Sequence, residues 1–110
     1  MDYSNIGLYL EAKGYFSETI EAVPSANDTY KARFRTTGTK AFSSVDGMVI
    51  VDYIPQNTET AFSISLCLLD RQTGETDVIR DGAFAGSKTI STKDLDEAVS
   101  YLERTITART

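Results

Sequence analysis

The sequence lacks histidine and tryptophan, and it has one cysteine and two prolines among 110 residues. Without histidine there is no Ser–His or Cys–His nucleophile pair and no imidazole to act as a general base near neutral pH. One cysteine cannot form an intramolecular disulfide, and alone it cannot make up the usual zinc ligand set. We therefore expect a protein that is not an enzyme and holds no metal or cofactor.

Long apolar runs are also lacking. No stretch approaches the roughly 20 apolar residues that cross a bilayer. Residues 1–15 lack the basic start and apolar core of a secretory signal. The length and the 41% hydrophobic content are those of one globular domain. We expect a single domain over 1–110, cytoplasmic in the cell or in an infected host, with no membrane contact.

The net charge is −5, and it is spread unevenly. Residues 29–45 hold four bases and no acid, whereas residues 46–110 hold eleven acids against six bases. An acidic total argues against direct binding of nucleic acid, whose phosphates attract basic proteins. It fits a partner with a basic surface, and it equally fits a simple requirement for solubility.

Alternating apolar residues predict an α+β fold built on an antiparallel sheet of four to five strands. The strands are expected at roughly 15–22, 29–36, 47–54, 61–69 and 75–80. Residues 15–23 also allow a short helix from Ser17, and Thr36–Lys40 is typical of a turn. Gly74 fits the left-handed position that closes a hairpin after Asp70.

Two helices are expected, at about 4–13 and about 92–107. Gly14 is a natural end for the first one. Ser91 and Asp94 have the spacing of a capping box, and Ile90 and Leu95 that of a hydrophobic staple. The second helix then carries one apolar stripe, made of Leu95, Ala98, Val99, Leu102 and Ile106.

The strand at 61–69 has two different faces. One face is apolar and is expected to lie under the second helix: Phe62, Ile64, Leu66 and Leu68. The other carries Ser63, Ser65 and Cys67, and the cysteine is interpreted as a structural thiol. The sequence does not say whether that second face is covered, and a homodimer or another partner could use it.

The loop at 81–89 partly matches the phosphate-binding pattern G-x-x-x-x-G-K-[ST]. Its candidate residues are Gly82, Gly86, Ser87, Lys88 and Thr89. Ser87 replaces the second glycine, whose backbone normally wraps the phosphate. The loop is therefore a candidate for anion binding rather than a nucleotide site.

Two charged groups are further candidates. Lys31, Arg33 and Arg35 would form a basic strand face, but Tyr30 and Phe34 alternate away from it, whereas nucleic-acid platforms combine aromatics and bases on one face. Four acids flank the hairpin after residue 69: Asp70, Glu75, Asp77 and Asp81. Their spacing matches no calcium loop, which favours a solvated turn, and they are also candidates for a protein-interaction surface.

The leading hypothesis is a small, acidic, non-catalytic protein-binding module. Its most specific form is a phage-type inhibitor that occupies a basic surface of a nucleic-acid-handling host enzyme, in the manner of anti-CRISPR or anti-restriction proteins. Two alternatives stay open: an adaptor or chaperone-like interaction domain, and a small-ligand or anion-binding domain that uses the 81–89 loop.

Overall fold

The strands form one antiparallel sheet in the computed structural model, which describes residues 3–22, 33–53, 62–81 and 90–109. The elements, in chain order, are α1 (Tyr3–Ala12), β1 (Phe16–Ala22), β2 (Arg33–Ala41), β3 (Val45–Tyr53), β4 (Phe62–Asp70), β5 (Thr76–Arg80) and α2 (Thr92–Arg109). The spatial order β1-β2-β3-β4-β5 follows the chain, so the sheet is a simple meander. The predicted α+β fold is confirmed, and residues 16–22 are a strand rather than a helix.

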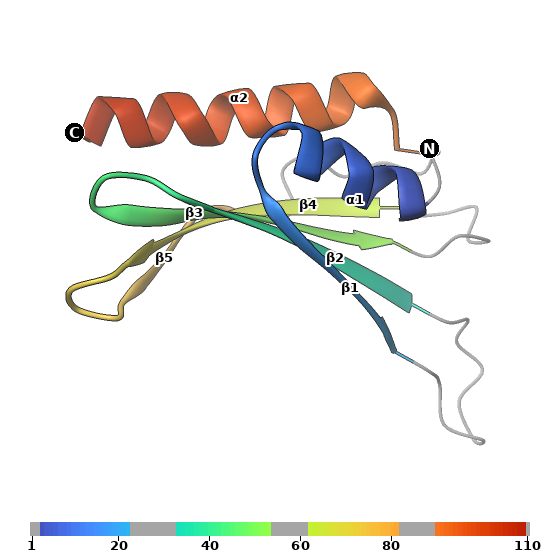
Figure 1. The fold of residues 1–110 in the computed structure, drawn as a ribbon, viewed down its shortest axis with the longest axis horizontal. Coiled ribbons are helices and arrows are strands. Elements are labelled where there is room, and N and C mark those ends of the chain that lie inside the picture. The colour runs from blue at the N-terminus through green and yellow to red at the C-terminus, as the bar shows by residue number, and fades with distance from the viewer. Residues whose placement is uncertain (1–2, 23–32, 54–61, 82–89, 110) are drawn as a thin grey trace.

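Both helices lie on the same face of the sheet (Figure 1). Helix α1 packs on β1 and β2, and α2 packs on β3 and β4. The core lies between the helices and this inner face. Its largest fully buried apolar side chains are Ile6, Leu10, Val49, Val51, Ile64, Leu66, Leu95 and Leu102.

The predicted core of β4 and α2 is confirmed. Phe62, Ile64, Leu66 and Leu68 are all buried on the inner face, and so is the whole apolar stripe of α2. The capping box is also present: the Asp94 backbone N–H donates to Ser91 Oγ at 3.2 Å, and the Ser91 N–H donates to Asp94 Oδ2 at 2.9 Å. The cap fixes where α2 begins, and the stripe fixes which side it presents to the sheet.

The turn predicted at Thr36–Lys40 is wrong. These residues lie inside β2, and Gly38 pairs with Val49 of β3. A Cβ built on Gly38 would lie 3.0 Å from Leu10 Cδ1, so the missing side chain makes room for α1. The chain reverses later, where the Phe42 N–H donates to the Val45 carbonyl at 2.9 Å.

The hairpin between β4 and β5 closes as predicted. Gly74 has φ +75°, and its N–H donates to the Asp70 carbonyl at 2.8 Å. The Asp70 carboxylate accepts from the backbone N–H groups of Gln72 and Thr73 at 2.8 and 3.2 Å. Asp70 therefore has a structural role in the turn.

Candidate functional site

The sheet face opposite the helices is called the open face below, because no helix of the described chain lies on it (Figure 1). The strand register assigns its residues, since alternate side chains point to opposite faces. They are Phe16, Glu18, Ile20, Arg35, Thr37, Thr39, Met48, Ile50, Asp52, Ser63, Ser65, Cys67, Leu69 and Val78. The open face is the largest surface of the sheet without a covering element among the described residues.

One row of residues crosses all five strands of the open face. Each member is the cross-strand partner of the next: Phe16, Thr39, Met48, Cys67 and Val78. Phe16 is 69% exposed and Val78 55%, and nearby Ile20 is 59% exposed. Among the described residues, the other large hydrophobic side chain with comparable exposure is Leu8 on α1, at 62%. Exposed large apolar groups therefore concentrate on the open face.

The predicted basic strand face is only partly described. Arg35 lies on the open face and makes a bidentate contact with Asp52 on β3: Nε to Oδ1 at 2.7 Å and Nη2 to Oδ2 at 3.1 Å. This contact raises the pKa of Arg35. Lys31 lies outside the described residues, and of Arg33 only the backbone, in β2, is described. Arg35 is thus paired with an acid of its own chain.

The aromatic Phe34 lies on the inner face, as its alternation with Arg35 predicted. Its ring stacks on Tyr53, with centroids 5.4 Å apart. Among the described residues, Phe34 therefore offers no stacking surface for nucleic-acid bases beside Arg35.

Cys67 lies on the open face but is only 6% exposed. Met48 and Val78 are its cross-strand partners and flank it on both sides. Burial raises the pKa of the Cys67 thiol, and the negative charges of Asp81 and Asp77 raise it further. The described geometry gives the thiol the surroundings of a structural cysteine.

We predict that Cys67 reacts slowly with maleimides in the folded protein, because little of it is thiolate at pH 7 and its sulfur is covered. Asp81→Asn should lower the thiol pKa and speed labelling, whereas Glu97→Gln on α2, which removes the same charge elsewhere, should not. Labelling rates across pH 7–9, followed by mass spectrometry, test this. A native rate equal to that of the urea-unfolded chain would contradict it.

Three of the four predicted hairpin acids surround one pocket, called the acidic pocket below. Asp70, Glu75 and Asp77 line it, and its volume is about 370 Å³. The remaining lining is Ser44, Val45, Leu68, Ile106 and Arg109. Arg109 Nη1 donates to Asp77 Oδ2 at 2.7 Å, so the pocket already borders a cation from α2. Asp81 lies apart, where it accepts from Ser65 Oγ at 3.1 Å.

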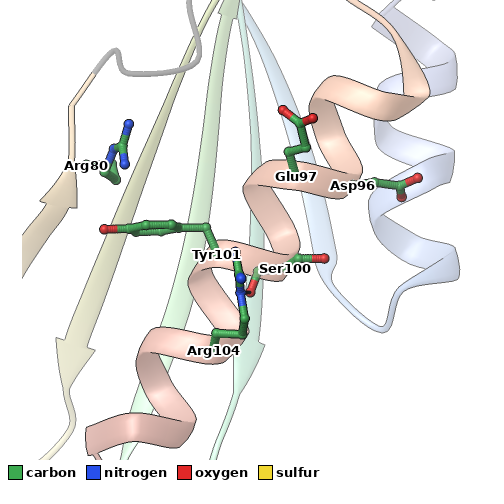
Figure 2. Close-up of a pocket in the computed structure, with 6 residues that line it drawn as sticks. All are labelled: Arg80, Asp96, Glu97, Ser100, Tyr101 and Arg104. Atoms are coloured by element: carbon green, nitrogen blue, oxygen red, sulfur yellow. Dashed lines mark hydrogen bonds between the residues drawn. The ribbon is translucent and has the colours of Figure 1, made fainter.

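A second hollow lies along α2 (Figure 2). It has a volume of about 620 Å³ and is lined by Arg80, Asp96, Glu97, Ser100, Tyr101 and Arg104. The Arg80 guanidinium lies 4.9 Å from the ring centroid of Tyr101. Figure 2 shows the other side chains spread along the helix, and Asp96 points toward α1, where it accepts a hydrogen bond from Tyr9. Charges of both signs line an open groove, and they do not converge on one point.

The candidate anion loop lies outside the described residues, so Gly82, Gly86, Ser87, Lys88 and Thr89 remain a prediction from the sequence. No group of three or more metal-ligating side chains occurs in the part of the chain that the structure describes. None of the helices described here has the length and apolar character needed to cross a membrane.

No protein-family model matches the chain, and the searches of curated proteins and of solved structures found no match. Function must therefore be argued from the surfaces themselves.

Proposed function

We propose that this protein is a protein-binding module and that the open face is its interaction surface. The observation that carries the proposal is the exposure of Phe16, Ile20 and Val78 on the open face, with Phe16 and Val78 at the two ends of the row. Extended apolar surface in contact with water is unfavourable, and on soluble proteins such patches mark sites that a partner covers.

The electrostatics of the open face support the same function. Its one described guanidinium, Arg35, is held by Asp52 at 2.7 Å and does not need a partner of opposite charge. Burying a pair that is already closed loses less free energy than burying a lone charge. The surface is therefore suited to apolar contact with another protein rather than to phosphates.

The test is a pair of substitutions on β1, Phe16→Lys with Ile20→Lys, compared with Leu8→Lys on α1. All three side chains are exposed, so each variant should keep the native circular dichroism and melting temperature within a few degrees. Affinity capture from the native host, analysed by mass spectrometry, should recover the same protein with the wild type and Leu8→Lys, and lose it with the β1 variant. Equal recovery by all three would contradict the proposal.

A second candidate function is occupation of a basic surface on a nucleic-acid-handling host enzyme, with the chain acting as an inhibitor. It is supported by the net charge of −5 and by the acidic pocket. The apolar lining residues Val45, Leu68 and Ile106 would accept the aliphatic part of a lysine or arginine, and its charge would bind the Glu75 carboxylate and compete with Arg109 for Asp77.

Neutralising Glu75 and Asp77 together (Glu75→Gln, Asp77→Asn) would test this second function. The matched control neutralises two acids elsewhere, Glu21→Gln and Glu97→Gln. Only the pocket variant should lose inhibition of DNA or RNA cleavage by host enzymes, and binding should weaken with salt. Equal loss in both variants would show that only total charge matters, and wild-type protein without inhibition would rule the function out.

A further inference from the structure

We propose that the occupant of the open face is a second copy of this chain, packed sheet against sheet about a two-fold axis. This inference rests on the proposed function, because it names the partner of the same surface. It commits to a homodimer with one contact face on each copy, as two-fold symmetry requires.

The order of the strands makes the open face compatible with such symmetry. β3 is the middle strand of five, with two strands on either side. A two-fold axis along β3, between the sheets, would place β1 of one copy over β5 of the other. Phe16 of each copy would then face the partner's Val78, and the two copies of Met48 would face each other near the axis. Thr39, the one polar member of the row, would face the partner's Cys67, and the other facing pairs of the row are apolar.

The size of the face is that of a stable interface. Five strands are roughly 24 Å wide at the usual spacing, and nine-residue strands such as β3 and β4 are roughly 30 Å long. Because β1 has seven residues and β5 five, the footprint is about 600 Å² on each copy, at the lower end of the range for standard-size interfaces. Two twisted sheets commonly pack with their strands about 30° apart, which a two-fold axis inclined by about 15° to β3 would give.

The charges also favour contact at this face. Each copy carries a net charge of −5, so two copies repel each other over most approaches. On the open face Arg35 is paired with Asp52, and at its end Asp46 is paired with Arg71 at 2.8 Å. Contact between two such faces therefore brings together two closed ion pairs, and it leaves the exposed carboxylate of Glu18, on the edge strand β1, at the solvent-facing rim of the contact.

The first experiment measures mass against concentration by sedimentation equilibrium. The wild type should approach twice the chain mass of 12.1 kDa. Phe16→Lys with Ile20→Lys should raise the dissociation constant of the dimer at least about 100-fold, because two-fold symmetry puts two lysines from each copy into the contact between β1 and the partner's β5. Leu8→Lys, with similar exposure on α1, should leave the dimer unchanged.

The second experiment tests the position of the axis. Met48→Cys in a Cys67→Ser background should form a covalent dimer with a short bifunctional maleimide, because the packed sheets lie about 10 Å apart and the two copies of position 48 face each other. Gln72→Cys in the same background, in the exposed β4–β5 turn, should stay monomeric under denaturing electrophoresis.

The outcomes separate this inference from the proposed function. A monomer at every concentration, without cross-linking at position 48, overturns the homodimer. If the wild type then captures a host protein that the β1 variant (Phe16→Lys with Ile20→Lys) does not, the open face binds that protein and the proposed function stands. A dimer that the β1 variant does not weaken also overturns the inference. If the protein is a monomer and the β1 variant captures the same host proteins as the wild type, both the homodimer and the proposed function are overturned.

Discussion

A methyl group at position 47 is expected to lower the free energy of unfolding by about 1–3 kcal/mol. Gly47 is buried on the inner face of β3, under α2. A Cβ there would lie 2.9 Å from Phe42 Cε2 and 3.0 Å from Ile106 Cδ1. In an unobstructed strand the same change would instead raise the free energy of unfolding by about 0.5–1 kcal/mol. The sign of the measured change therefore shows whether α2 packs closely on Gly47. Urea unfolding of Gly47→Ala measures it.

The control is Gly7→Ala in α1. There the nearest atom to the new Cβ is Ser17 Oγ at 3.3 Å, a hydroxyl that can rotate away, and helix propensity should raise stability by up to about 1 kcal/mol. Ile106→Val removes the Cδ1 atom that Gly47→Ala would crowd. The double variant should therefore lose less stability than the sum of its single changes, by about 0.5 kcal/mol or more. A fully stable Gly47→Ala would contradict the close packing of α2 on β3.

Local patterns were sufficient to predict most of the fold. Helix α2 was predictable because Ser91 and Asp94 fix its start and its apolar residues recur at helical spacing. The central strands were predictable because β-branched and aromatic residues fill them between clear turn residues. These signals act between neighbours in the sequence, so they do not depend on the tertiary arrangement.

Gly38 shows where the local pattern fails. Its neighbours are Thr36, Thr37, Thr39 and Lys40, and a glycine among polar residues is typical of turns. The sequence contains no sign that Leu10 packs directly above Gly38. The same limit applies to the ion pairs. Arg35 with Asp52, and Arg109 with Asp77, join different elements and depend on register and helix placement.

The candidate surface was predictable only in part. Phe16, Glu18 and Ile20 share one face of a strand, and an acid between two apolar residues is the pattern of neither a buried face nor a polar one. The structure explains the mixture, since that face is exposed and Glu18 lies at the edge of the sheet. Met48 and Ile50 gave β3 apolar residues on both faces, but whether the second face is covered depends on where both helices pack.

We expect a large loss of stability on truncation of Tyr15, which contacts α1 through its backbone and α2 through its hydroxyl. This side chain is 2% exposed, and its hydroxyl donates to Glu103 Oε1 of α2 at 3.0 Å. Its backbone N–H donates to the Leu10 carbonyl at 2.9 Å, at the end of α1. Tyr15→Ala should lower the free energy of unfolding by about 3–5 kcal/mol, as for other large aromatic truncations. Tyr15→Phe, which removes only the hydrogen bond, should lower it by about 1 kcal/mol.

The tyrosines also predict loss of stability in alkali. Burial and then the charge of Glu103 raise the pKa of Tyr15, and burial with Asp96 raises that of Tyr9. In the unfolded chain a tyrosine ionises near pH 10, so above that pH the unfolded state binds fewer protons than the folded one. The contribution of Tyr15 to the free energy of unfolding is therefore fully present below about pH 10. It falls as the pH rises further, by at most about 1.4 kcal/mol per pH unit for each such tyrosine. Urea unfolding between pH 9 and 11.5 should give a smaller slope for Tyr15→Phe than for the wild type. Equal slopes would mean that the Tyr15 hydroxyl ionises equally in the folded and unfolded states, and would contradict its burial against Glu103.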